Sequence, residues 1–477
     1  MIIVGSGFSG ICMGIKLKEA GIQDFIILEK AKSLGGTWRE NTYPGAECDI
    51  PSALYSYSFV SYPDWEYKWS LQPQILSYLE ICAEEYGIIS HIHFEQEVTS
   101  TSWQESKSWQ VSTTTDTFES QHVVFATGQL HHPSTPSWPG QGLYEGPTWH
   151  SAKWNHDVDL SDKRVGVIGN AASAIQFIPE IAKEVKELTI FQRSANWILP
   201  KQDRLYKDWE KTLVRKLPFL LKIYRFRIWM LGGGLFFMMK GDRTPIRSLY
   251  QYLTKRYIRK EIKDEDLQQK LIPKFRMGAK RVLFSDTYYQ ALAKSHVHLT
   301  DARISSWTTK GLMTDDDQEH VLDVIICATG FQTQPLLDKL DITGRDGLHL
   351  RKYWKEGPKN YLGMTMSNFP NLFLMYGPNT NLGHNSIIIM SEAQANYIIQ
   401  CISELDRQQK NQIEVKPNSI DVYYHRIQER LKKMIWSSIE GSWYQNKQGV
   451  QTLNWPGRTW EYIRRTKKVD FREYVLS

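Results

Sequence analysis

The first twenty-one residues, MIIVGSGFSGICMGIKLKEAG (Met1–Gly21), decide the fold. A short apolar strand runs into the pattern Gly5-x-Gly7-x-x-Gly10, and a helix follows that ends at Gly21. The stretch DFIILEK then predicts a second strand that ends at Glu29, nineteen residues after Gly10. Strand, glycine loop, helix, second strand and acid, in this order, form the fingerprint of a Rossmann-like dinucleotide-binding unit.

Each part of this fingerprint has a physical task. Gly5 permits the tight turn, Gly7 lets a pyrophosphate approach the backbone, and Gly10 lets the helix pack on the strand. Glu29 is placed to accept a hydrogen bond from a ribose hydroxyl group. Because a glutamate repels a 2′-phosphate, we expect this unit to bind FAD or NAD rather than NADPH.

A second copy of the pattern lies in KRVGVIGNAASAIQFIPEIA, residues 163–182. A strand leads into Gly169 and Asn170, and Ala171 and Ala174 replace the later glycines. The strand after it is followed by Arg193 and Ser194, where the first copy has Glu29. An arginine suits a 2′-phosphate, so the second unit is expected to bind NADPH. The alternative is a surface arginine that follows a structural βαβ unit.

Two similar segments indicate how the domains are connected. HVVFATG and DVIICATG each predict a buried strand that ends in Ala-Thr-Gly, near residues 128 and 330. We therefore predict an α/β protein with two Rossmann-like dinucleotide-binding domains, of which the FAD domain is discontinuous. The predicted parts are an FAD domain (1–128 and 333–477), a linker (129–159), an NADPH domain (160–202 and 277–332) and a helical insert (203–276).

Composition excludes several classes of protein. The five cysteines are scattered and contain no Cys-x-x-Cys, which argues against a disulfide framework, a zinc site and a dithiol reductase. No metal site is expected. The net charge of +6 without a dense basic cluster favours small anionic ligands over nucleic acid. With a strand expected directly after Met1, no signal peptide is expected, and we expect a cytoplasmic protein. The oligomeric state is left open.

Two further segments resemble a known family. YEGPTWHSAKWNHD matches the Baeyer–Villiger monooxygenase fingerprint Phe-x-Gly-x-x-x-His-x-x-x-Trp-Pro/Asp at Gly146, His150 and Trp154, with Tyr144 and Asn155 departing from it. GGTWRENTYPGAECD matches the family's second signature throughout, from Gly35 to Asp49. The chain therefore resembles the Baeyer–Villiger monooxygenases, which are class B flavoprotein monooxygenases.

The resemblance implies that FAD, NADPH and O2 convert a ketone to an ester or lactone through a C4a-peroxyflavin. It makes Arg281 the active-site arginine, Lys280 a partner of Arg193 on the 2′-phosphate, and His150 a structural residue that couples domain motion. The residues expected at FAD are Gly5, Gly7, Ser9, Gly10, Glu29, Gly36, Trp38, Asp49, Tyr55 and Val98. Those expected at NADP are Glu47, Cys48, Gly169, Asn170, Ala171, Ser173, Ala174, Arg193, Ser194, Lys280 and Arg281.

The chemistry explains why an aspartate follows the Tyr-Pro-Gly turn. Oxygen insertion into a ketone builds up negative charge in a dry cavity, where a fixed cation stabilises it. Arg281 keeps its charge, and Asp49 is expected to pair with Arg281 and aim it. In the simpler alternatives, Asp49 caps a helix or pairs with a nearby lysine, and Arg281 binds phosphate.

Two other functions remain open: a heteroatom oxygenase that acts on sulfides or amines, and a non-oxygenating NADPH- or flavin-binding regulator. The insert carries the apolar run Ile228–Met239, which is too short to span a bilayer. We favour Trp229–Met239 as the buried wall of a substrate tunnel. A weak contact of residues 228–239 with an anionic membrane surface is the alternative.

Overall fold

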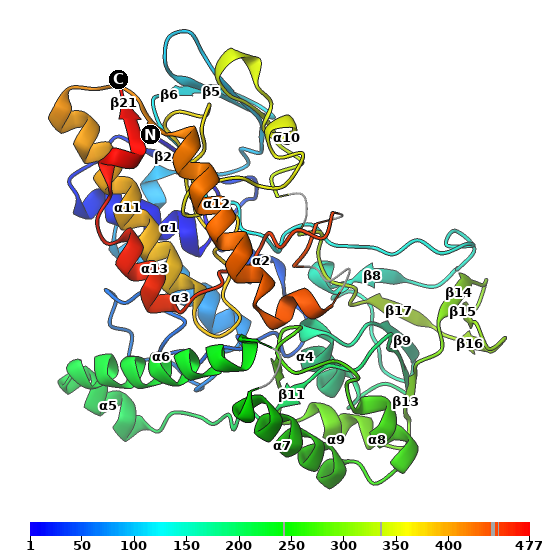
Figure 1. The fold of residues 1–477 in the computed structure, drawn as a ribbon. Coiled ribbons are helices and arrows are strands. Elements are labelled where there is room, and N and C mark those ends of the chain that lie inside the picture. Colours follow the sequence, from blue (N-terminus) through cyan, green and yellow to red (C-terminus); the bar gives the residue numbers. More distant parts are fainter. Residues whose placement is uncertain (242–243, 334–335, 440–443, 447) are drawn as a thin grey trace.

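The computed structural model describes residues 1–241, 244–333, 336–439, 444–446 and 448–477. Its first layer is a parallel sheet in the order β19-β7-β1-β2-β3. Figure 1 labels β2 of this sheet and β8, β9, β13 and β17 of the second sheet. The strands are β1 (Ile2–Val4), β2 (Ile26–Leu28), β3 (Ile92–His93), β7 (Val123–Phe125) and β19 (Leu372–Leu374). Helix α1 (Phe8–Glu19) connects β1 to β2, as the fingerprint predicts. Because β19 pairs with β7, this domain is built from two distant segments of the chain.

The second layer repeats the design in the order β13-β10-β9-β17-β8. Its strands are β8 (Thr148–His150), β9 (Arg164–Ile168), β10 (Glu187–Phe191), β13 (Val297–Thr300) and β17 (Val324–Cys327), and α4 (Ala172–Ile181) connects β9 to β10. Strand β8 lies inside the segment 129–159 that we expected to be a linker. It pairs in parallel with β17, so this part of the segment is an edge strand of the second sheet.

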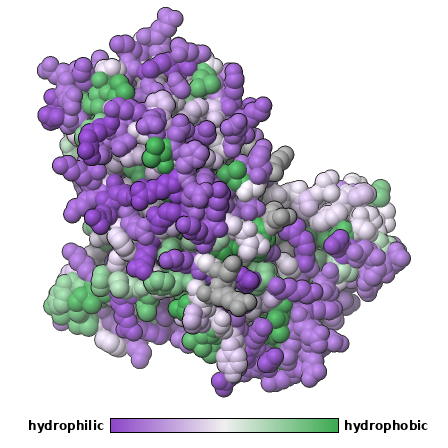
Figure 2. Space-filling view, viewed as in Figure 1, coloured by the Kyte–Doolittle hydropathy of each residue, from purple (hydrophilic) through white to green (hydrophobic). Residues whose placement is uncertain are grey.

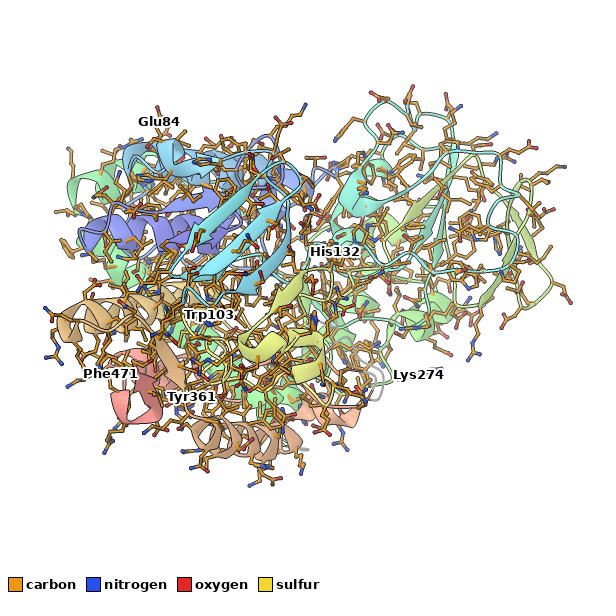
Figure 3. All side chains as sticks on the ribbon, turned by 90° about the horizontal axis from the view of Figure 1, so that it is seen from above. Glu84, Trp103, His132, Lys274, Tyr361 and Phe471 are labelled. Carbon is orange, nitrogen blue, oxygen red and sulfur yellow. The ribbon has the colours of Figure 1, made fainter. Side chains whose placement is uncertain are left out.

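The chain crosses between the two layers twice at one place. Ser134 N donates to Gly330 O at 2.8 Å, and Gln332 N donates to His132 O at 2.8 Å. Seen from above, the two layers lie side by side with His132 between them (Figure 3). The α/β fold with two Rossmann-like layers, one of them discontinuous, is the fold expected from the sequence.

Smaller elements complete the two layers. Further strands are β4 (Val98–Trp103), β5 (Trp109–Thr113), β6 (Thr117–Ser120), β11 (Ile198–Leu199), β12 (Leu283–Phe284), β14 (Ile304–Trp307), β15 (Gly311–Thr314), β16 (Glu319–Val321), β18 (Asp341–Thr343), β20 (Ile413–Val415) and β21 (Tyr474–Leu476). Further helices are α2 (Thr37–Glu40), α3 (Gln72–Glu85), α9 (Tyr288–Leu292), α10 (Leu350–Tyr353), α11 (Ile387–Gln408), α12 (Pro417–Lys432) and α13 (Thr459–Thr466). Short 3-10 helices are η1 (Ile89–His91), η2 (Ser151–Lys153), η3 (Arg345–Gly347), η4 (Ile435–Ser438) and η5 (Phe471–Glu473).

The insert is helical, as expected. It contains α5 (Asp208–Lys216), α6 (Phe219–Met239), α7 (Pro245–Glu261) and α8 (Glu265–Leu271). The run Trp229–Met239 is divided, because Phe236, Met238 and Met239 are buried whereas Met230 and Leu231 are more than half exposed. Phe237, between the buried residues, is 42% exposed. The prediction of a buried wall is therefore wrong for Met230, Leu231 and Phe237, and a membrane contact is wrong for the three buried residues. Within the described residues, no helix is long and apolar enough to cross a membrane.

Because α1 lies close to the glycine loop after β1, adding one methyl group at Gly10 is expected to disturb flavin binding. A Cβ atom at Gly10 would lie 1.8 Å from the Gly5 carbonyl oxygen, so Gly10→Ala must push α1 away from the glycine loop. We expect the purified Gly10→Ala protein to lose most of its flavin, measured from the ratio of visible to ultraviolet absorbance. In the control Gly14→Ala, the nearest atoms are side-chain ends at 3.3 Å, and flavin content should stay near that of the wild type. Full flavin content in Gly10→Ala would contradict the expectation.

Candidate active site

The first glycine loop is shaped to hold a pyrophosphate. Gly5 has φ of +101°, a conformation that favours glycine, and a Cβ atom there would lie 2.9 Å from Ala126 O. Gly7 and Gly36 face each other, since a Cβ atom at Gly36 would lie 3.3 Å from Gly7 Cα. No side-chain hydrogen bond caps the start of α1. Its first N–H groups therefore point to a cradle that fits the pyrophosphate of a dinucleotide.

Glu29 lies buried at the end of β2, where the fingerprint expects it. One carboxylate oxygen accepts from Ser6 N at 2.9 Å and Ser6 Oγ at 2.7 Å. The other accepts from Ala31 N at 3.0 Å and from Arg39 at 3.1 Å. These bonds fix Glu29 against the glycine loop, and its contact with a ribose stays a prediction.

Four more residues expected at FAD lie in different surroundings. The Ser9 hydroxyl is hydrogen-bonded to Ser391 Oγ on α11 at 3.0 Å, which leaves the Ser9 backbone for a ligand. Trp38 Nε1 donates to Tyr55 Oη at 3.0 Å, and both residues follow Gly36 in the sequence. Val98, at the start of β4, is buried in the core cluster beneath the first sheet.

The second glycine loop has the same shape in the second layer. Gly169 has φ of +107°, and a Cβ atom there would lie 2.4 Å from Ala328 O. Helix α4 starts after Ala171 without a side-chain cap, with Ser173 in its first turn and Ala174 buried. The loop is therefore also open to a phosphate, although alanines replace its later glycines.

A group of cations lies beside this second loop. Asn170 Nδ2 donates to Ser194 O at 3.1 Å, and Lys280 Nζ donates to Ser194 Oγ at 3.0 Å. Burial and the charge of Arg193 lower the pKa of Lys280. No carboxylate of the described residues forms an ion pair with Arg193 or Lys280. Two neighbouring cations without a counter-ion fit a bound 2′-phosphate.

The arginine and aspartate singled out by the sequence form a bidentate pair. Arg281 Nε donates to one Asp49 carboxylate oxygen at 2.7 Å, and its terminal nitrogen donates to the other at 2.5 Å. The two residues are 232 positions apart, one in each predicted nucleotide domain. The Asp49 charge raises the pKa of Arg281, so the guanidinium stays charged. Because the Arg281 side chain is 37% exposed, it is aimed by Asp49 without being enclosed.

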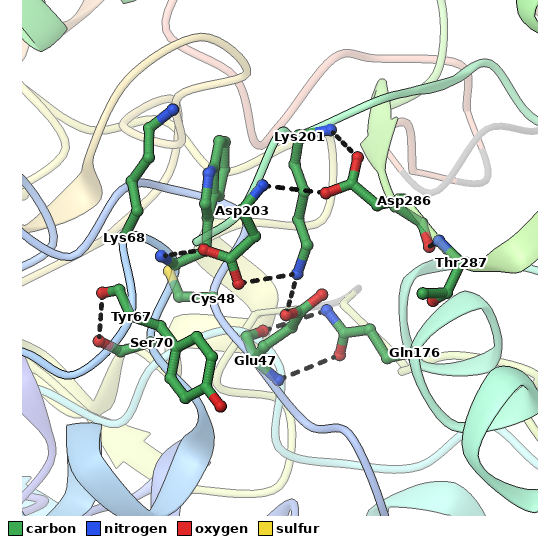
Figure 4. A network of polar contacts seen from close by, with 12 residues as sticks. Glu47, Cys48, Tyr67, Lys68, Ser70, Gln176, Lys201, Asp203, Asp286 and Thr287 are labelled. Carbon is green, nitrogen blue, oxygen red and sulfur yellow. Dashed lines mark hydrogen bonds and ion pairs between the residues drawn. The ribbon is translucent and has the colours of Figure 1, made fainter. Parts of the chain in front are cut away.

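A second network holds the same loop from the other side (Figure 4). The Glu47 side chain forms an ion pair with Lys201, and Lys201 Nζ also lies 3.7 Å from Asp203. Gln176 on α4 accepts from Glu47 N at 3.4 Å and donates to Glu47 O at 3.1 Å. The adjacent Cys48 is buried, and burial raises its thiol pKa. The segment before Asp49 is thus attached to the second domain.

Sequence reasoning missed several residues of this region. Tyr43 Oη donates to Gln176 Oε1 at 2.8 Å, and its place in the Tyr-Pro-Gly turn was the only available signal. Tyr376 and Tyr444 lie close enough to Arg281 to influence its pKa. Lys201 carries no recognisable motif, and only the folded chain brings it to Glu47.

The fingerprint residues pack on the second sheet. His150, on β8, accepts from Ala152 N at 3.1 Å, and burial lowers its pKa. The ring of Trp154 lies 5.2 Å from that of Phe177 on α4. A Cβ atom at Gly146 would lie 2.3 Å from Tyr144 Oη. The coupling of His150 to domain motion stays a prediction.

Comparison with known proteins places these features in context. A family model described as Pyridine nucleotide-disulphide oxidoreductase matches residues 2–215. A protein named Baeyer-Villiger monooxygenase from Streptomyces coelicolor is 38% identical over 99% of this chain and 92% of its own length. Cyclohexanone monooxygenase from Rhodococcus sp. Phi1 bound to NADP+ superposes with a TM-score of 0.90 and 28% identity, over 100% of this chain and 98% of its own. The structure of the OTEMO complex with FAD and NADP superposes with a TM-score of 0.90 and 26% identity, over 100% of this chain and 99% of its own.

The cations beside the second loop predict a change in coenzyme preference. Replacing Arg193 by alanine removes a charged donor to the 2′-phosphate, worth about tenfold or more in binding. We expect the KM for NADPH to rise by this factor and the KM for NADH to change little, measured by absorbance at several coenzyme concentrations. Lys186→Ala, an exposed lysine before β10, serves as the control. An equal rise for both coenzymes in Arg193→Ala would refute the assignment.

The Glu47 network predicts a pH dependence of stability. Burial raises the pKa of Glu47 from 4.5 to about 7, against the opposing effect of Lys201. The folded protein therefore binds more protons than the unfolded chain in this range, so the free energy of unfolding falls as the pH rises from 4.5 to about 7. Glu47→Gln should remove this fall, which amounts to at most about 3 kcal/mol.

Melting temperatures of the wild type and Glu47→Gln, measured at several pH values across this range, test the expectation. The control Glu105→Gln changes an exposed residue and should keep the wild-type profile. Parallel profiles of the wild type and Glu47→Gln would show that Glu47 does not titrate there.

Proposed function

This chain belongs to the Baeyer–Villiger monooxygenase family, and we propose that Arg281, aimed by Asp49, is its catalytic residue. The enzyme uses FAD, NADPH and O2 to convert ketones to esters or lactones. One oxygen atom enters between the carbonyl carbon and its neighbour, the other leaves as water, and NADPH supplies two electrons. FAD, when bound, takes these electrons and activates O2.

The two cradles suggest which domain holds which cofactor. We assign FAD to residues 1–128 and 333–477, where Glu29 disfavours a 2′-phosphate and the glycine loop admits a pyrophosphate. NADPH is assigned to residues 160–202 and 277–332, where Arg193 and Lys280 supply charge for the 2′-phosphate. The Asp49–Arg281 pair joins these two parts, and the reacting groups would meet beside it.

Arg281 stabilises the charge that forms on the ketone. As oxygen adds to the carbonyl carbon, the carbonyl oxygen becomes negative, and a guanidinium that cannot lose its proton stabilises it. Part of the Arg281 side chain is exposed, so a donor remains for the substrate when Nε and one terminal nitrogen are used by Asp49.

Asp49 acts through Arg281. A guanidinium in a site closed by two cofactors loses water, and a paired carboxylate offsets that loss. The two parallel hydrogen bonds also fix the plane of the guanidinium, which a single bond does not. Asp49 is therefore a positioning residue.

A cytoplasmic location is part of the same proposal. All five cysteines are buried and unpaired, which suits a reducing compartment. They also leave no dithiol for disulfide reduction.

The test separates catalysis from coenzyme binding. With cyclohexanone as substrate, we expect Arg281→Ala to lower ester formation by about 10²–10³-fold while NADPH oxidation continues with release of hydrogen peroxide. Asp49→Ala should lower it by about tenfold or more, because an unaimed arginine remains. Product is measured by gas chromatography, and NADPH and peroxide are measured in parallel.

Arg164→Ala is the matched control, because Arg164 forms a similar bidentate pair with Asp323 at 3.1 and 2.6 Å on the second sheet. It should retain ester formation. Equal loss of NADPH oxidation and ester formation in Arg281→Ala would assign Arg281 to coenzyme binding instead. Methyl phenyl sulfide, tested beside cyclohexanone, measures the share of heteroatom oxidation.

A further inference from the structure

Helix α6 is attached to the first domain by one face. Arg225 on this helix donates to Ser56 Oγ at 2.6 Å, and the Trp229 carbonyl accepts from Asn385 Nδ2 at 3.1 Å. A Cβ atom at Gly232 would lie 2.6 Å from His384 O. At 3.6 residues per turn, positions 225, 229 and 232 share one side of the helix. The orientation of α6 is thereby fixed.

Another face of α6 presents large apolar side chains to solvent. Phe219, Ile223, Phe226 and Met230 are 53%, 59%, 59% and 54% exposed. Their spacing places them within about 60° of one another around the helix axis, well away from the attached face. Trp209 on the preceding helix α5 is 61% exposed. These five residues form the α5–α6 apolar face, and Figure 2 shows hydrophobic side chains gathered at the free end of α6.

The charge along the α6 part of this face has one sign, whereas on α5 Asp208 and Glu210 flank Trp209. Residues 211–241 contain seven lysines and arginines and no aspartate or glutamate. Lys222 and Arg227 are exposed and lie on opposite sides of the apolar stripe. In the described part of the chain, no carboxylate forms an ion pair with Lys216, Lys222 or Arg227. The α6 part of the apolar face is therefore bordered by free positive charge.

This combination decides what covers the face. Phenylalanine, isoleucine and methionine on one face of a helix, flanked by lysine and arginine as on α6, are typical of a helix that lies in the interface of an anionic bilayer. A second copy of the chain would bring the same cations against each other, which disfavours a symmetric dimer here. We propose that the α5–α6 apolar face docks on the surface of an anionic membrane, without crossing it.

The other end of α6 ties this surface to the active site. Met238 and Met239 are buried, and a Cβ atom at Gly278 would lie 3.3 Å from Met238 O. Gly278 is three residues before Arg281 in the same loop. The docking face ends at Met230, nine residues or roughly 13 Å along the helix axis from Met239, so α6 connects the membrane surface to that loop.

Sedimentation of the FAD-loaded enzyme with vesicles tests the proposal. The wild type should bind vesicles that contain phosphatidylserine and bind pure phosphatidylcholine weakly, and added salt should reduce the binding. The double variant Ile223→Asp/Phe226→Asp should lose at least about tenfold in binding. Lys222→Gln and Arg227→Gln should each lose about fivefold. The controls Leu143→Asp and Val422→Asp change residues that are 55% and 62% exposed elsewhere, and they should bind as the wild type does.

Flavin content and NADPH oxidation in solution show that each variant is folded. Absence of wild-type binding to anionic vesicles overturns the proposal, as does equal binding by the double variant and the controls. Analytical ultracentrifugation tests the alternative that a second copy of the chain covers this face. Concentration-dependent dimers that disappear in the double variant would assign the face to a second copy of the chain.

Discussion

The ion pair between Asp49 and Arg281 is the interaction on which the rest of this architecture depends. Its partners come from loops 232 residues apart, so it forms only when both nucleotide domains have folded and docked. A charged guanidinium must be kept near the place where a reaction creates negative charge, and removing it from water is costly without a partner. Two residues earlier, Glu47 reaches Lys201 and Gln176 of the other domain. The Tyr-Pro-Gly loop is therefore held by the second domain on both sides of Cys48, which restricts the directions that Asp49 can take.

The two nucleotide layers share a backbone design and differ in charge. Each has a glycine with positive φ after its first strand and an uncapped helix beyond it, which is the common requirement of a phosphate. The two domains differ in the charge of the residues that follow the second strand. In the first layer Glu29 is buried and bonded to the glycine loop, whereas in the second Arg193 and Lys280 lie together without a carboxylate in the described residues. One repeated fold can in this way serve two cofactors, because a few side chains decide which ribose substituent is tolerated.

Local patterns predicted much of this correctly. Both βαβ units, the Ala-Thr-Gly strands and the helical insert follow from short-range periodicity and glycine placement. Strand β8 was missed because three residues carry little pattern, and only pairing with β17 makes them a strand. The division of α6 was missed because large apolar residues occur along the whole helix, and only the packing of its last residues on clusters of both domains decides which of them are covered. Lys201 and Gln176 could not be found, since their contacts with Glu47 join segments more than a hundred residues apart.

A double-mutant cycle on ester formation tests the central claim most directly. The variants are Asp49→Asn, Arg281→Lys and the two combined, with the rate of flavin reduction by NADPH as an internal reference. If Asp49 works by aiming Arg281, changing Asp49 should cost little activity once Arg281 has been replaced. The double variant should then be no slower than the slower single variant. Losses that multiply in the double variant would show that the two residues act independently, and the positioning role of Asp49 would be wrong.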